Sequence, residues 1–124
     1  METQNSQPSN LTIRERMKAD LTAAMKARQM QTASTLRTVL GTIDNAEAVP
    51  VTTPVAYTNG KTNDVPRKHL TAADIEQILR QELQSRAAMV QKYQDLGREE
   101  DAVRLQAEVT LIAGYLYQLS SEKP

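Results

Sequence analysis

Glu82 and Arg86 are the charged residues whose spacing most strongly suggests a specific role. On a helix with about 100° of turn per residue, both project into the middle of an apolar face that Tyr93 continues. The four-residue spacing lets the carboxylate and the guanidinium meet. An ion pair that faces a core needs further hydrogen bonds, because desolvation otherwise outweighs the attraction. The pair therefore favours either a structural contact between helices or a shallow polar groove that recognises a ligand.

Other charged residues border the same predicted core. Glu47 projects toward the apolar stripe of its helix and Arg37 lies at the edge of that stripe, while Glu108 and Arg98 border a later apolar seam. Charged residues near a core are usually paired with one another. We therefore predict a structural polar network that fixes the register of the helices, made of Arg37, Glu47, Glu82, Arg86 and Glu108. The alternative is that these groups line a ligand-binding groove.

The residue types needed for catalysis or metal binding are scarce. The chain has no Cys and a single His, His69, which precedes a predicted helix start. A zinc site usually needs several imidazoles or thiolates, and a nucleophile needs a base and an orienting group beside it. We therefore expect no catalytic residues, no metal and no cofactor, and we do not expect an enzyme.

Charge is balanced over the chain but not along it. Residues 1–68 carry nine Lys/Arg against six Asp/Glu, a net of +3, and residues 69–124 carry six against nine, a net of −3. This asymmetry suits complementarity between the two halves or a modest anion-facing surface on the first half. Residues 1–10 are polar, and no apolar run approaches the roughly 20 residues of a membrane span. We expect a disordered leader at 1–10, no membrane contact and a cytoplasmic protein.

The first half predicts two helices. Thr12 and Glu15 form a capping box, and apolar residues follow at helical spacing: Ile13, Met17, Leu21, Ala24 and Met25. We expect a break near residues 28–31 and a second helix over about 32–47. The short turn favours an antiparallel hairpin.

The second half predicts two longer helices after a loop. Pro50, Pro54 and Pro66 exclude a helix over 49–68 and indicate an irregular loop, either a mobile spacer or a functional segment. A third helix opens at Thr71 and should continue to about Leu96, with Gly97 as its stop. A fourth begins near Glu99, and its acidic first turn suits the positive end of a helix.

These elements define an all-α fold. The chain has 124 residues, enough for one domain, and lacks Phe and Trp, which suits a helical bundle built on aliphatic side chains. We predict about four helices in two antiparallel hairpins, joined by a long Pro-containing loop. The expected domain is 11–119, with the first hairpin at 11–48, the loop at 49–70, the second hairpin at 71–119 and a tail at 120–124.

An ordered series of motifs gives the chain a family resemblance. The series comprises Leu21-Thr-Ala-Ala-Met-Lys26, Thr35-Leu-Arg37, Arg80-Gln-Glu-Leu-Gln-Ser-Arg86, Tyr93, Leu96-Gly-Arg98, Ala107-Glu108 and Gly114-Tyr-Leu116. It resembles the GatB/YqeY domain family over roughly 11–119. That family includes stand-alone proteins and the tail of the B subunit of tRNA-dependent amidotransferases, where the tail is associated with tRNA binding and catalysis resides elsewhere.

The resemblance implies a non-catalytic helical binding module that contacts tRNA or an amidotransferase-like complex. We predict electrostatic docking onto a phosphate backbone by five basic residues: Arg14, Lys18, Lys26, Arg28 and Arg98. The alternative is a protein–protein interaction or self-association domain, forming a homo-oligomer, with no nucleic-acid role.

Overall fold

The computed structural model describes residues 12–48 and 69–121. These residues form four α-helices, α2 (Ile13–Lys26), α3 (Met30–Glu47), α4 (Ala72–Asp95) and α5 (Glu99–Ser121). The chain is an all-α bundle, as the sequence predicts. The predicted leader at 1–10, residues 49–68 of the predicted loop, and residues 122–124 of the predicted tail lie outside the described residues.

Capping boxes start two of the helices. The Thr12 hydroxyl accepts a hydrogen bond from the Glu15 amide at 3.1 Å, and the Thr12 amide donates to the Glu15 carboxylate at 3.2 Å. Thr71 and Asp74 repeat the arrangement at the start of α4, at 3.1 and 3.0 Å. Each box satisfies two amides that the helix itself leaves without partners. Both starts are therefore determined by local sequence.

The two short turns between helices close with the same motif. After α4, the Arg98 amide donates to Tyr93 O at 2.8 Å, the Gly97 amide donates to Gln94 O at 3.0 Å, and Gly97 has φ 75°. After α2, the equivalent bonds run from Gln29 to Ala24 O and from Arg28 to Met25 O, at 2.9 and 3.2 Å. These are Schellman motifs, whose left-handed position usually holds glycine. In the turn after α2 the left-handed position is occupied by Arg28, with φ 60°.

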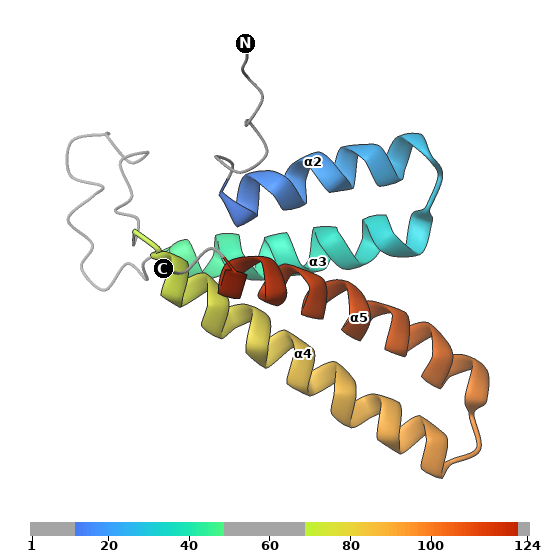
Figure 1. The fold of residues 1–124 in the computed structure, drawn as a ribbon. Helices are drawn as coiled ribbons and strands as arrows, with labels where there is room; N and C mark the ends of the chain where they lie inside the picture. The colour runs from blue at the N-terminus through green and yellow to red at the C-terminus, as the bar shows by residue number, and fades with distance from the viewer. Residues whose placement is uncertain (1–11, 49–68, 122–124) are drawn as a thin grey trace, which may run out of the picture.

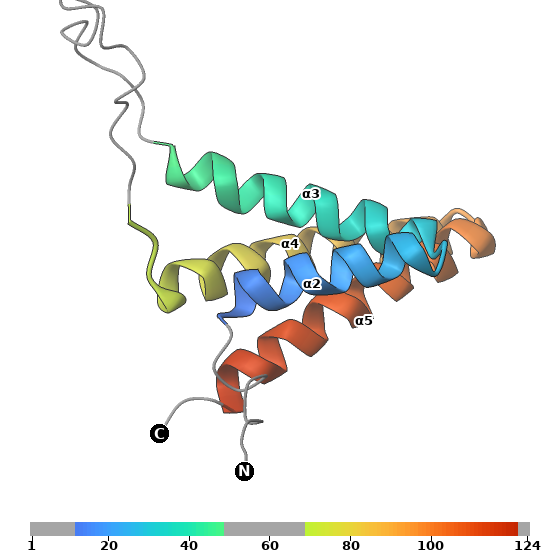
Figure 2. The same ribbon diagram turned by 90° about the horizontal axis from the view of Figure 1, so that it is seen from above.

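The core side chains of all four helices converge toward the end of the bundle where α2 begins and α5 ends, which we call the converging end. α2 packs along α3 and α4 packs along α5, while α3 contacts both α4 and α5 and α2 also contacts α5. Figure 1 shows the two helix pairs separating toward their turns, and Figure 2, seen from above, shows α3 and α5 spread apart at the opposite end, where both of them end. The turn-proximal parts of α4 and α5 thus form a two-helix arm.

The hydrophobic core lies at the converging end. Its largest fully buried side chains come from all four helices: Met17, Leu36, Val39, Ile43, Leu79 and Ile112. The apolar stripes of the sequence extend further along the helices than the core does, because the two helix pairs separate toward their turns (Figure 1). Met25 at the end of α2 is 46% exposed, and Leu96 at the end of α4 is 69% exposed. The amphipathic pattern therefore identified the inward face of each helix, but it predicted burial of residues near the turns that are in fact exposed.

Candidate functional site

Arg86 joins two glutamates at the base of the arm. Its Nη1 donates to the Glu82 carboxylate at 2.6 Å, and its Nε donates to Glu108 at 2.8 Å, which connects α4 to α5. The Arg86 side chain is 14% exposed. Burial by itself lowers the pKa of Arg86, but the hydrogen bonds and attraction from Glu82 and Glu108 outweigh it and raise that pKa. The guanidinium therefore stays charged and its main hydrogen bonds are made within the protein.

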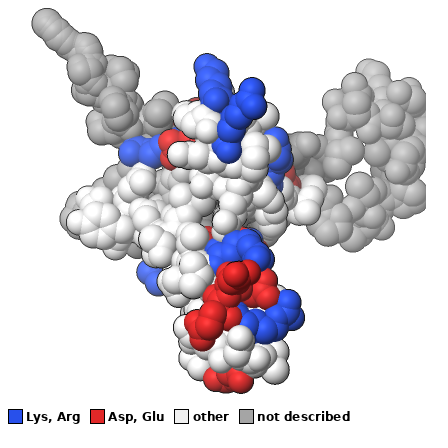
Figure 3. Space-filling model, turned by 90° about the vertical axis from the view of Figure 1, so that its right-hand side faces the viewer, with Lys and Arg blue, Asp and Glu red and all other residues white. Residues whose placement is uncertain are grey.

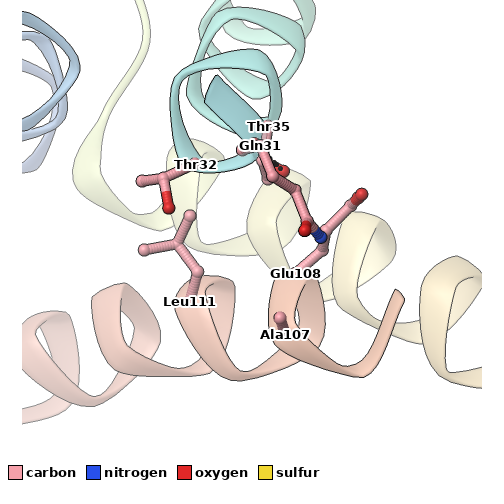
Figure 4. A pocket seen from close by; sticks show the side chains of 6 residues that line it. All are labelled: Gln31, Thr32, Thr35, Ala107, Glu108 and Leu111. Carbon is pink, nitrogen blue, oxygen red and sulfur yellow. Dashed lines mark hydrogen bonds between the residues drawn. The ribbon is translucent and has the colours of Figure 1, made fainter. Parts of the chain in front are cut away.

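A small pocket adjoins this ion network. It measures about 80 Å³ and is lined by Gln31, Thr32, Thr35, Ala107, Glu108 and Leu111. Figure 4 shows the side chains of α3 and α5 facing each other across it. The Thr35 hydroxyl donates to Gln31 O at 3.0 Å. The pocket has room for a few water molecules at most, and Glu108 is the one ionisable side chain among the six residues that line it.

The predicted polar network divides into separate parts. Glu82, Arg86 and Glu108 come together, whereas Glu47 pairs with Arg14 at 3.0 Å and Arg37 donates to Met25 Sδ at 3.5 Å. Arg37, on α3, therefore contacts the end of α2 and takes no part in the contacts between Arg86 and the two glutamates. A cluster of three or more His, Cys, Asp or Glu side chains placed to hold a metal is absent from residues 12–48 and 69–121.

The predicted nucleic-acid residues are also spread over the molecule. Arg14 lies at the converging end, where Nη1 bonds Glu47 and Nη2 lies 3.9 Å from Asp44. Arg98 lies at the α4–α5 turn, where it pairs with Asp101 at 2.6 Å and stacks over the Tyr93 ring at 5.2 Å. Lys18 is exposed along α2. Only Lys26 and Arg28 of the five lie together, at the α2–α3 turn.

We use the term basic end for Lys26, Arg28 and Arg37. All three side chains are exposed, and residues 21–43 contain no Asp or Glu. Figure 3 looks onto this side of the molecule: blue atoms gather at the top, over the α2–α3 turn, and red and blue atoms mix below, over the α4–α5 turn. The first turn itself therefore carries positive charge alone, whereas the second carries both signs.

Three tertiary contacts had no signal in the sequence analysis. The Tyr115 hydroxyl donates to the Asp20 carboxylate at 2.5 Å, the Gln31 amide donates to Arg104 O at 2.6 Å, and Arg14 bonds Glu47 at 3.0 Å. The pairs are separated by 95, 73 and 33 positions. Covariation between aligned homologues is the kind of signal that finds such pairs.

None of the four described helices is both long enough and apolar enough to serve as a membrane span.

Comparison with known families identifies the chain. A family model described as Yqey-like protein matches residues 14–123, nearly the whole sequence, so the chain belongs to the YqeY-like family. This confirms the resemblance to the GatB/YqeY domain family. Comparison with curated proteins and with solved structures gives no match.

Proposed function

We propose that this YqeY-like protein is a non-catalytic helical binding module that docks through its basic end onto the phosphate backbone of an RNA. The proposal rests on one observation, the grouping of three exposed cations, Lys26, Arg28 and Arg37, within a stretch, 21–43, that contains no Asp or Glu. tRNA, alone or held in an amidotransferase-like complex, is the partner that the family resemblance implies.

The charge environment of these cations supports the proposal. Lys26 and Arg28 have no ion pair among the described residues, whereas Arg14 and Arg98 each have a carboxylate partner. A phosphate can approach an unpaired cation without first breaking a salt bridge. Lysine and arginine contacts to phosphate release counterions, so the affinity depends on salt concentration. Three contacts predict a loss of affinity of about 40-fold between roughly 50 and 200 mM salt.

The test is titration of labelled bulk tRNA with two variants that carry the same net charge. One combines Lys26→Gln with Arg28→Asn, since Asn tolerates the left-handed backbone of residue 28. The other combines Lys18→Gln with Lys92→Gln, where Lys92, like Lys26, lies in the last turn of its helix. We expect binding to weaken about tenfold or more in the first variant and about twofold in the second. Equal loss in both variants, or no binding at low salt, would exclude the basic end as an RNA site.

A further inference from the structure

An open groove separates the two turns. It has a volume of about 400 Å³ and is lined by Gln31, Glu99, Glu100, Val103 and Arg104. Gln31 crosses it to donate to Arg104 O at 2.6 Å, which fixes the start of α3 beside the first turns of α5. The groove therefore lies between the start of α3 and the first turns of α5.

Apolar side chains are exposed beside and within the groove. Met30 is 59% exposed and Val103 is 68% exposed; Val103 lines the groove, and Met30 directly precedes the lining residue Gln31. Burial of such side chains against a partner is favourable. A cluster of exposed apolar side chains rimmed by polar residues is typical of an interaction surface.

Unpaired charges of opposite sign flank the groove. Lys26 and Arg28 lie on the α2–α3 side, and Glu99 and Glu100 lie on the α5 side; all four are exposed. Among the described residues, no ion pair involves any of these four. Asp101 differs, because it binds both Arg98 and Arg104, at 2.6 and 3.0 Å.

We propose that this groove is the contact surface between two copies of the chain, related by a two-fold axis. Two such faces packed together in inverted orientation bring the basic end of each copy against Glu99 and Glu100 of the other. The apolar middle of each face, with Met30 and Val103, then meets its own counterpart. The same patch serves both partners, as a two-fold interface requires. The parallel orientation sets like charges against each other and is disfavoured.

Self-association would also regulate the proposed RNA contact. Lys26 and Arg28 would be covered in the dimer, so RNA and a second copy would compete for them, and by mass action RNA would favour the monomer. This competition rests on the proposed function, whereas dimer formation does not.

The test is sedimentation equilibrium of the full chain from about 5 to about 500 µM in about 50 mM salt. We expect the average mass to rise from 13.8 kDa toward twice that value. One variant carries Lys26→Glu and Arg28→Glu, and a second carries Glu99→Lys and Glu100→Lys. Each alone should remain monomeric, because like charges then face each other. An equimolar mixture of the two should associate, since both contacts of the mixed dimer regain opposite charges.

Two controls keep the test decisive. Circular dichroism and thermal unfolding check that each variant is folded, because lysines in the first turn of α5 oppose its helix dipole. Lys92→Glu, at a residue that is not among those lining the groove and is also in a last helical turn, should leave the association unchanged. A monomer at every concentration, or a mixture that does not associate, overturns the dimer. A dimer that tRNA does not dissociate counts against the proposed RNA contact and leaves the dimer supported.

Discussion

The Tyr115 hydroxyl on α5 donates a hydrogen bond to the Asp20 carboxylate on α2, with 2.5 Å between the two oxygens. Tyr115 is buried, at 3% exposure, whereas Asp20 is exposed. The bond therefore joins the core to the outer surface of α2. It connects two helices that have few other contacts, so it helps to hold the first helix pair against the second.

Tyr115→Phe should lower the free energy of unfolding by about 1–2 kcal/mol. The substitution removes a hydrogen bond to a charged acceptor but keeps the ring packed in the core. The loss is limited because Asp20 can bind water once the hydroxyl is gone. Urea unfolding measures the change. A matched Tyr117→Phe variant, at a side chain that is 74% exposed, should change stability by less than about 0.5 kcal/mol.

The free energy of unfolding should fall steeply at alkaline pH, because Tyr115 loses its proton more readily in the unfolded chain than in the folded one. Burial and the hydrogen bond and charge of Asp20 raise the pKa of Tyr115 above its ordinary value of 10.0. The unfolded chain releases this proton near pH 10 while the folded chain keeps it. The contribution of Tyr115 to the free energy of unfolding is therefore complete below pH 10. Above that pH it decreases by up to about 1.4 kcal/mol per pH unit. Unfolding measured from about pH 9 to 11 should show a smaller slope in Tyr115→Phe; identical slopes would contradict the prediction.

The Arg86–Glu108 pair should show stronger coupling than a surface pair on the same helix. In a double-mutant cycle with alanine, we expect about 1–2 kcal/mol for Arg86 and Glu108, whose side chains are 14% and 22% exposed. Arg80 and Glu76 are also paired, at 2.8 Å, but Arg80 is 54% exposed. Their coupling should be about 0.2–0.5 kcal/mol and should diminish with salt. Equal coupling energies would mean that Arg86 does not stabilise the contact between α4 and α5.

The two turns should respond oppositely to substitution at their left-handed residue. Gly97→Ala should destabilise the protein by about 1 kcal/mol, and the cost lies in the backbone, because an added Cβ meets nothing within 4 Å. Arg28→Gly should stabilise it by about 0.5 kcal/mol, since relief of the φ 60° strain exceeds the added flexibility of the unfolded chain. Thermal unfolding distinguishes the two. A loss of stability in Arg28→Gly would mean that the Arg28 side chain contributes to folding.

Substitution of Arg14 should lower the stability of the protein but leave its affinity for tRNA nearly unchanged. Arg14→Gln removes the 3.0 Å bond to Glu47 that ties the start of α2 to the end of α3, so we expect a loss of about 1–2 kcal/mol. Because Arg14 is partly buried and engaged, tRNA affinity should change by less than about threefold at a temperature where the variant is folded. A large loss of tRNA affinity would place the RNA contact at the converging end instead of the basic end.

The sequence by itself determined the helical class and most helix boundaries. Capping boxes at Thr12 and Thr71 and the stop at Gly97 depend on residues three or four positions apart, so their physics is contained in the local chain. The start of α3 was less well predicted. It begins at Met30 after a left-handed Arg28, a residue type that gives no turn signal.

The tertiary structure decided which charged groups meet. Periodicity showed that Glu82, Arg86 and Glu47 face inward, and within one helix that was enough to pair Glu82 with Arg86. It could not show that Glu47 meets Arg14. Such contacts depend on how far apart two helices lie and how they are rotated against each other. Those quantities are set by packing of the whole core, because a helical pattern defines the direction of a side chain but not the element that lies opposite it.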